Sequence, residues 1–172
     1  MYIPTTSLTQ GGGDVVRLFD SKLGADAANF DVTGISSSYK HLFIMFYGRS
    51  TLGANTDSVN VRFNNDSGTN YSYVNVGGTA AASLTAVFAG TVCANNIANG
   101  AGWCNIWVPD YTDTTFYHLA QSNWGYTAFG VTSGTNQHEN AWDTNNVAIN
   151  RVTVFGAANW KAGSRLTVYG LA

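Results

Sequence analysis

Apolar and polar residues alternate with a period of two along much of this chain. The pattern is most regular over residues 58–64, where polar side chains separate Val59, Val61 and Phe63. Such alternation is typical of a β-strand with one face in a core and the other in solvent. Residues 64–68 are turn formers and strand-type composition resumes over 71–76, so we predict a β-hairpin here.

The segment from Lys40 to Tyr47 differs because both of its faces are apolar. One side would carry Leu42, Ile44 and Phe46, and the other Phe43, Met45 and Tyr47. A strand of this kind is either central in a packed sandwich or has one face at a subunit interface. We therefore take Phe43, Met45 and Tyr47 as candidate interface residues.

The remaining strand-type segments follow one another at short spacing, with turn residues between them. They cover residues 14–19, 84–92, 103–108, 115–122, 126–132, 147–155 and 165–171. This spacing suits an antiparallel sandwich or barrel. No segment has the periodicity of an amphipathic helix over a useful length. We predict an all-β fold, an antiparallel β-sandwich of jelly-roll-like form, with residues 14–172 as one domain.

Three segments have the composition of irregular structure. Two polar stretches, 94–102 and 133–146, are predicted loops, which are common places for binding residues. Residues 1–13 contain Pro4 and three consecutive glycines and predict a flexible N-terminal arm. The arm either lies on a neighbouring subunit, with Tyr2, Ile3 and Pro4 as candidate contacts, or is simply a frayed terminus.

Composition narrows the range of functions. Charged residues make up only 10% of the chain, against roughly 25% in ordinary soluble domains. Such a surface suits a subunit packed against neighbours or a lectin-like module. The net charge is −2 and no basic run occurs, so we expect neither nucleic acid nor membrane as a partner. No secretory signal or membrane-spanning run is recognisable, and we expect synthesis in a cytosol.

The titratable residues give no signature of catalysis, of a metal or of a cofactor. His41, His118 and His138 lack the ligand spacing of a metal site; the first two lie in predicted strands, and His138 lies beside Glu139 in a predicted loop. Each of four aspartates has turn-type neighbours and is interpreted as a turn former, namely Asp57, Asp66, Asp110 and Asp113. We predict no catalytic, metal or cofactor residue.

The two cysteines and several aromatic residues each leave two interpretations open. Cys93 and Cys104 are either buried thiols, which we favour for a protein made in a cytosol, or a disulfide. The aromatic residues could form a platform for sugar rings, although core packing or subunit contact accounts for them more simply. These residues are Tyr71, Tyr73, Trp124, Tyr126, Trp142 and Trp160.

Three stretches together resemble a known class of proteins. They are 35–50, which begins Ile-Ser-Ser-Ser-Tyr-Lys-His-Leu, 61–73, which begins Val-Arg-Phe-Asn-Asn-Asp-Ser-Gly, and the C-terminal region with Asn-Arg-Val-Thr-Val-Phe-Gly at 150–156 and Asn-Trp-Lys-Ala-Gly-Ser-Arg-Leu-Thr-Val-Tyr-Gly-Leu at 159–171. Their order and spacing resemble small virion structural proteins of tailed bacteriophages. The resemblance covers nearly all of the chain from about residue 14 onward.

This resemblance implies a non-enzymatic β-sandwich protein of the virion. No long stalk precedes the domain, which favours a capsid decoration or cement protein that binds and stabilises the assembled shell through the major capsid protein or other virion proteins. We expect a homotrimer, located in the virion after synthesis in the host cytoplasm. The alternative is a tail-fibre module that binds host surface glycans, with Tyr126 and Trp142 as candidate contacts.

Overall fold

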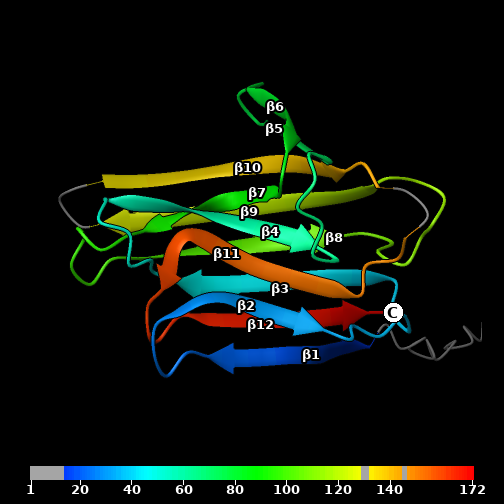
Figure 1. Ribbon diagram of the computed structural model, residues 1–172, viewed down its shortest axis with the longest axis horizontal. Coiled ribbons are helices and arrows are strands. Elements are labelled where there is room, and N and C mark those ends of the chain that lie inside the picture. The colour runs from blue at the N-terminus through cyan, green and yellow to red at the C-terminus, as the bar shows by residue number, and fades with distance from the viewer. Residues whose placement is uncertain (1–13, 129–131, 145–146) are drawn as a thin grey trace, which may run out of the picture.

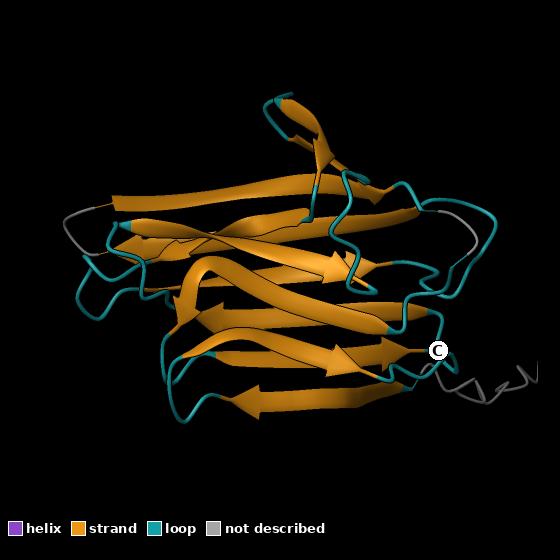
Figure 2. Cartoon of the chain, in the orientation of Figure 1, coloured by secondary structure: helices purple, strands orange, loops and turns teal. Residues whose placement is uncertain are grey.

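The computed structural model describes residues 14–128, 132–144 and 147–172 (Figure 1). The predicted arm, with Tyr2, Ile3 and Pro4, lies outside these residues. The described part of the chain contains β-strands and no helix (Figure 2), hence no helix that could cross a membrane. The strands are β1 (Val15–Lys22), β2 (Ala27–Thr33), β3 (His41–Gly48), β4 (Thr56–Phe63), β5 (Tyr71–Asn75), β6 (Ala80–Leu84), β7 (Val87–Cys93), β8 (Ala101–Val108), β9 (His118–Ala128), β10 (Thr132–Trp142), β11 (Arg151–Trp160) and β12 (Arg165–Leu171).

These strands form two antiparallel sheets that stack face to face. The larger sheet has the order β1-β12-β3-β8-β9-β10-β5-β6, and the smaller has the order β2-β11-β4-β7. The pairs β1/β12, β2/β11, β3/β8 and β4/β7 are nested within one another along the chain and alternate between the two sheets. This nesting is the rolled-up topology of a jelly roll. The predicted antiparallel, jelly-roll-like β-sandwich is confirmed.

Two hairpins are inserted into the jelly roll, and both join the larger sheet. The first, β5–β6, lies between β4 and β7 in the chain, and the second, β9–β10, lies between β8 and β11. Strand β9 pairs with β8, β10 pairs with β9, and β5 pairs with β10. The larger sheet therefore extends well past β8, and the β5–β6 hairpin stands out from the body of the molecule (Figure 1).

The core lies between the sheets and is built from the inward positions of alternating strands. Ile44 and Phe46 from β3 are fully buried, as are Val61 and Phe63 from β4. The ring of Phe46 packs at 4.7 Å, between centroids, against the ring of Trp160 on β11. Burial of each such side chain stabilises the fold by about 1.5–3 kcal/mol. The alternation seen in the sequence over 58–64 is confirmed.

The predicted hairpin over residues 58–76 is wrong, because β4 and β5 belong to different sheets. Asn64 and Asn65 do adopt positive φ, as the turn prediction requires, but the connection crosses from one sheet to the other. Tyr71 holds this crossing together. Its buried hydroxyl accepts the backbone N–H of Phe63 at 3.1 Å and lies 3.2 Å from the carbonyl of Asp66.

The predicted loop over 133–146 is also wrong, because β10 occupies most of it and pairs with β9 along its whole length. Its polar inward side chains suggested a loop, but they are hydrogen-bonded partners within the sandwich. Asn140 donates to the carbonyl of Ala120 at 3.1 Å and to the Ser122 hydroxyl at 3.2 Å. Strand β9 is accordingly one long strand where we predicted two, and β2 and β6 were not predicted.

Candidate functional site

Strand β3 exposes the apolar residues of its second face on the outer side of the larger sheet. Phe43, Met45 and Tyr47 alternate along it with fully buried residues. Met45 is 40% exposed and Tyr47 is 58% exposed, while Phe43 is half-buried. Clustered exposed apolar residues mark interaction sites more often than isolated ones do. We call these three residues the β3 strip.

Strand pairing extends this surface sideways. Tyr47 on β3 lies opposite Trp103 on β8, Trp103 lies opposite Gly125 on β9, and Gly125 lies opposite Thr135 on β10. Neighbouring strands are about 4.8 Å apart, so the four positions span roughly 14 Å across the sheet. We call Tyr47, Trp103, Gly125 and Thr135 the aromatic row.

The indole of Trp103 lies against the backbone of Gly125. A Cβ atom added to Gly125 would lie 3.1 Å from Nε1, 3.2 Å from Cε2 and 3.2 Å from Cζ2 of Trp103. Three ring atoms at nearly equal distance show that the ring lies flat over the glycine. Trp103 remains 42% exposed, so its other face is open to solvent.

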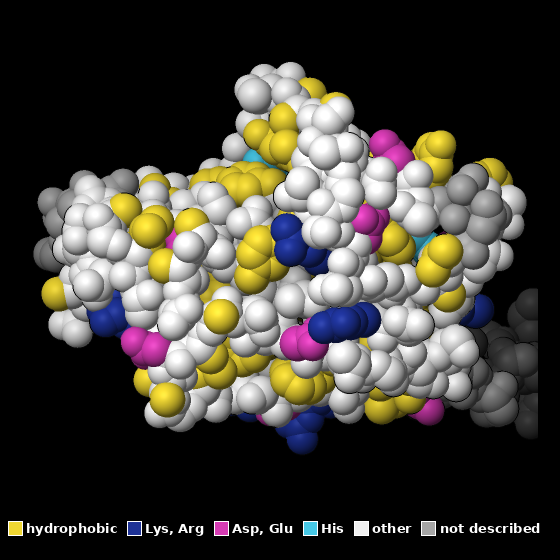
Figure 3. Space-filling view, viewed as in Figure 1, with side chains coloured by type: hydrophobic (Ala, Val, Ile, Leu, Met, Phe, Trp, Pro, Cys, Tyr) yellow, Lys and Arg dark blue, Asp and Glu magenta, His cyan; other side chains and the backbone are white. Residues whose placement is uncertain are grey.

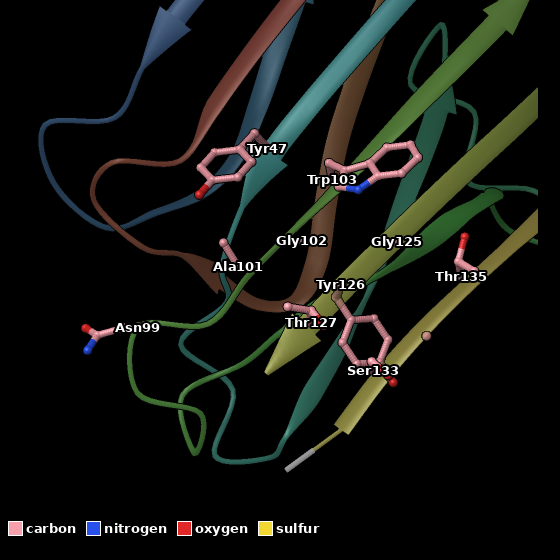
Figure 4. A pocket seen from close by; sticks show the side chains of 11 residues that line it. Tyr47, Asn99, Ala101, Gly102, Trp103, Gly125, Tyr126, Thr127, Ser133 and Thr135 are labelled. Atoms are coloured by element: carbon pink, nitrogen blue, oxygen red, sulfur yellow. The ribbon is translucent and has the colours of Figure 1, made fainter. Parts of the chain in front are cut away.

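An open groove of about 560 Å³ runs along the aromatic row on the outer side of the larger sheet (Figure 4). Besides the row it is lined by Asn99, Ala101, Gly102, Tyr126, Thr127, Ser133 and Gly134. A smaller hollow of about 300 Å³ adjoins it and shares Tyr47 and Trp103. The groove therefore combines aromatic rings with amide and hydroxyl groups, a combination common in ligand sites.

Amide side chains lie along the next row of outward positions. Asn105, Asn123 and Gln137 are aligned in register across β8, β9 and β10. Gln137 donates to Glu139 at 3.2 Å, and Thr135 donates its hydroxyl to the carbonyl of Trp124 at 2.8 Å. These contacts order the polar side chains beside the groove, and a Thr hydroxyl that donates retains acceptor capacity.

Within the part of the chain that the structure describes, no residue that lines the groove is charged. Arg165 lines the smaller hollow, and its Nε donates to Asp20 at 2.7 Å. That hydrogen bond, together with the attraction between the two charges, holds the pKa of Asp20 below its ordinary value. The opposite face of the sandwich, toward the viewer in Figure 3, carries separate basic and acidic side chains among hydrophobic and other uncharged surface.

The two predicted glycan contacts do not lie together. Tyr126 is half-buried, packs against Cys93 and Ile97, and lines the groove. Trp142 is 2% exposed and belongs to the core. Its Nε1 donates to the carboxylate of Asp66 at 2.7 Å. The exposure expected for Trp142 is wrong, because the tryptophan ends a strand instead of lying in a loop.

For the six aromatic residues we favoured core packing or subunit contact. Core packing is confirmed for the three that are fully or almost fully buried, Tyr71, Trp142 and Trp160. The other three are half-buried. Trp124 stacks on Tyr126 with the ring planes 1° apart and donates through Nε1 to His138 at 3.1 Å. None of the six forms a continuous exposed platform.

The histidines have structural contacts. The Nδ1 atom of His41 accepts the backbone N–H of Asp110 at 3.1 Å, and Nε2 of His118 lies 2.9 Å from the carbonyl of Val147. His138 lies in β10 and is 3% exposed, so its predicted loop position is wrong. Burial lowers the pKa of His138. Within the described residues no three metal-ligating side chains form a cluster.

Asp66 and Asp113 serve turns, as predicted. Asp113 accepts the backbone N–H of Thr115 at 2.7 Å, and Asp66 accepts that of Gly68 at 2.8 Å. Burial opposes the ionisation of Asp66, but hydrogen bonds from Asn70, Trp142, Gly68 and Thr144 outweigh it and hold its pKa below the ordinary value. The prediction was wrong for Asp57.

Asp57 lies within β4 and is 4% exposed. Its carboxylate accepts the Ser50 hydroxyl at 2.6 Å and the backbone N–H groups of Ala157 and Ala158 at 3.1 and 3.3 Å. These contacts hold the irregular part of β11, where its register with β2 shifts. Cys93 and Cys104 are free and buried, so the thiol interpretation is confirmed.

Sequence reasoning did not single out Trp103 or Trp107, although both lie in a predicted strand. Alternation over 101–108 places both tryptophans on the face opposite Cys104 and Ile106. From this pattern, a second strand with apolar residues on both faces could have been predicted. Their position beside the β3 strip depends on the β3/β8 pairing, which one sequence does not reveal.

Searches of protein-family models, curated proteins and solved structures find no match to this chain.

Proposed function

We propose that this protein is a non-enzymatic structural protein of a tailed-bacteriophage virion that decorates the capsid and stabilises the assembled shell. The observation that carries the proposal is the β3 strip, an exposed apolar surface on a chain with only 10% charged residues. Apolar and aromatic residues on a charge-poor face are typical of protein interfaces. The strip and the N-terminal arm are the proposed contacts with the major capsid protein or another virion protein.

The rigidity of the domain supports the same proposal. A continuous core joins both sheets, so each copy acts as a stiff bridge between neighbouring shell subunits. Binding only to the assembled shell stabilises that shell by mass action, and weak contacts add up over many symmetric copies. The same jelly-roll architecture occurs in viral coat and sugar-binding domains, although a fold alone does not fix a function.

The protein is proposed to act as a homotrimer, because capsids offer threefold positions and closed symmetric assembly suits an apolar strip. Light scattering at high micromolar concentration is expected to give a trimer mass. A strictly monomeric species under those conditions would remove the trimer from the proposal without affecting attachment to the shell.

Attachment is tested by sedimentation with purified shells that lack the protein. The wild-type chain should sediment with assembled shells, and Met45→Ser and a chain without residues 1–13 should each sediment less. Val76→Ser is the matched control, because Val76 is an exposed apolar residue, 76% accessible, away from the strip. Equal sedimentation of Met45→Ser and wild type would count against the β3 strip as a contact with the shell.

Location in the virion is tested by antibody-gold labelling of intact particles in the electron microscope. Label spread over the head is expected from a decoration protein. Label confined to the tail would overturn the decoration proposal in favour of a tail-fibre module.

A further inference from the structure

The aromatic row has the shape of a stacking surface. The Trp103 ring packs over the backbone of Gly125, which limits the orientations open to it before a ligand arrives. Tyr47 lies on the adjacent strand and is 58% exposed. A flat, pre-ordered aromatic ring with one open face suits a ligand that is itself flat and partly apolar on one side.

The polar groups at the groove define the rest of the ligand. Thr127, Ser133 and Thr135 supply hydroxyls and Asn99 supplies an amide; the Thr135 hydroxyl donates to Trp124 and offers a ligand its acceptor lone pairs, while the other groups can both donate and accept hydrogen bonds. Groups of this kind match a ligand that carries many hydroxyls. The roughly 14 Å length of the row, three strand spacings, exceeds the size of a single small ring.

The lining also determines the charge of the ligand. Among the described residues none that lines the groove is charged, and the guanidinium of Arg165, in the adjoining hollow, is bound to Asp20. An anionic ligand would find no free cation in the groove, and a cationic one would find no carboxylate. We propose that the groove binds a neutral oligosaccharide, with Trp103 stacked on one sugar ring and the hydroxyl and amide groups bonded to its neighbours.

This inference goes beyond the proposed function, because it concerns a small ligand and not a partner in the virion. It is tested on the purified full chain labelled with 5-fluorotryptophan, in which each of the five tryptophans gives its own ¹⁹F resonance. The probes are cellotetraose, maltotetraose and triacetylchitotriose, each at about 10 mM, which populates a complex of millimolar affinity. Sialyllactose is the anionic comparison.

We expect at least one neutral probe to shift the Trp103 resonance and to leave that of Trp107 in place. Trp107 is the matched reference, because it also points outward from β8 but packs against His41, 5.0 Å away between ring centroids. Trp103→Ala should weaken binding by about tenfold or more, whereas Trp107→Ala should change it by less than about twofold. Gly125→Ala should also weaken binding, because the added methyl displaces the indole.

The proposal is overturned if no neutral probe shifts the Trp103 resonance, or if binding survives Trp103→Ala. Preferential binding of sialyllactose would overturn the assignment of the ligand as a neutral saccharide. Circular dichroism checks that each variant is folded, and Trp103→Ala alone remains decisive if Gly125→Ala does not fold. Shell sedimentation separates this proposal from the previous one. Trp103→Ala should sediment with shells like the wild type, whereas Phe43→Ser, at the strip residue that lines neither the groove nor the adjoining hollow, should lose shells and keep the saccharide.

Discussion

Replacement of Trp142 tests whether this residue belongs to the core or to a binding surface. The side chain is 2% exposed and packs against Phe63, Tyr71 and His118, with ring centroids 5.5 to 6.2 Å away. Truncation of a buried tryptophan to alanine costs about 3–5 kcal/mol through lost contacts and the cavity left behind. For a domain of this size that loss lowers the Tm by about 6–20 °C.

A second substitution, Trp142→Phe, separates the contribution of ring packing from that of the hydrogen bond between Trp142 and Asp66. Trp142→Phe keeps a ring in the core but removes the Nε1 donor, which lies 2.7 Å from the carboxylate. A hydrogen bond to a charged group contributes about 1.5–3 kcal/mol. Trp142→Phe should therefore destabilise the protein by about that amount, less than Trp142→Ala. Asp66 keeps its bonds to Gly68 and Asn70 in both variants.

The assay is equilibrium denaturation in urea, with Trp103→Ala as the comparison. Trp103 is 42% exposed, and its removal should cost about 1 kcal/mol or less. The expected order of destabilisation is Trp142→Ala, then Trp142→Phe, then Trp103→Ala. If Trp142→Ala cost no more than Trp103→Ala, the assignment of Trp142 to the core would be refuted.

Three further predictions concern the interior. Gly102→Ala should clearly lower the urea concentration at the unfolding midpoint, because the added Cβ would lie 2.7 Å from the backbone Cα of Val92. An unchanged midpoint would contradict the close approach of β7 and β8. Cys93 and Cys104 are buried thiols whose pKa is raised by burial, so Ellman's reagent should react with them only after denaturation, and fast reaction in the native protein would be inconsistent with the structure. Burial lowers the pKa of His138 below its ordinary 6.5, so between the lowered value and 6.5 the unfolded chain binds more protons than the folded one. Stability should rise with pH through that window and level off above it, with a slope of at most about 1.4 kcal/mol per pH unit, and this rise should flatten in His138→Gln.

Apart from β2, which was missed although its Phe30 and Val32 are buried, strands with regularly spaced apolar inward residues could be predicted from the sequence. In β4 the alternation of Val59, Val61 and Phe63 with polar residues is regular, and the two-sided pattern of β3 correctly indicated an apolar outer face. Strand β10 could not be recognised, because its inward positions include His138 and Asn140. Residues on β9 supply hydrogen-bond partners for the His138 ring and for the Asn140 side-chain nitrogen, and those partners become visible only in three dimensions.

The candidate site could be predicted only in part, for a related reason. Tyr47 was identifiable, since its place in β3 follows from local alternation. The aromatic row was not, because it joins residues from four strands whose order in the sheet is fixed by pairing across long distances in the chain. Likewise, nothing local indicated that the turn after β4 leads to the other sheet, where Tyr71 enters the core.

The groove exists because of the second inserted hairpin. A jelly roll of the eight nested strands alone would end its larger sheet at β8, and the Trp103 ring would then overhang a sheet edge. Strand β9 supplies Gly125 as the floor beneath that ring, and β10 supplies Thr135 beyond it. Alternate residues of the same hairpin point into the interior of the sandwich. His138 and Asn140 are two of them, and both form hydrogen bonds with β9, while the residues next to them in β10 point outward. Because successive strand residues point to opposite faces, the outer residues of β9 and β10 can vary without disturbing the core. We therefore expect changes of ligand to arise on the outer face of this hairpin, while the nested strands preserve the fold.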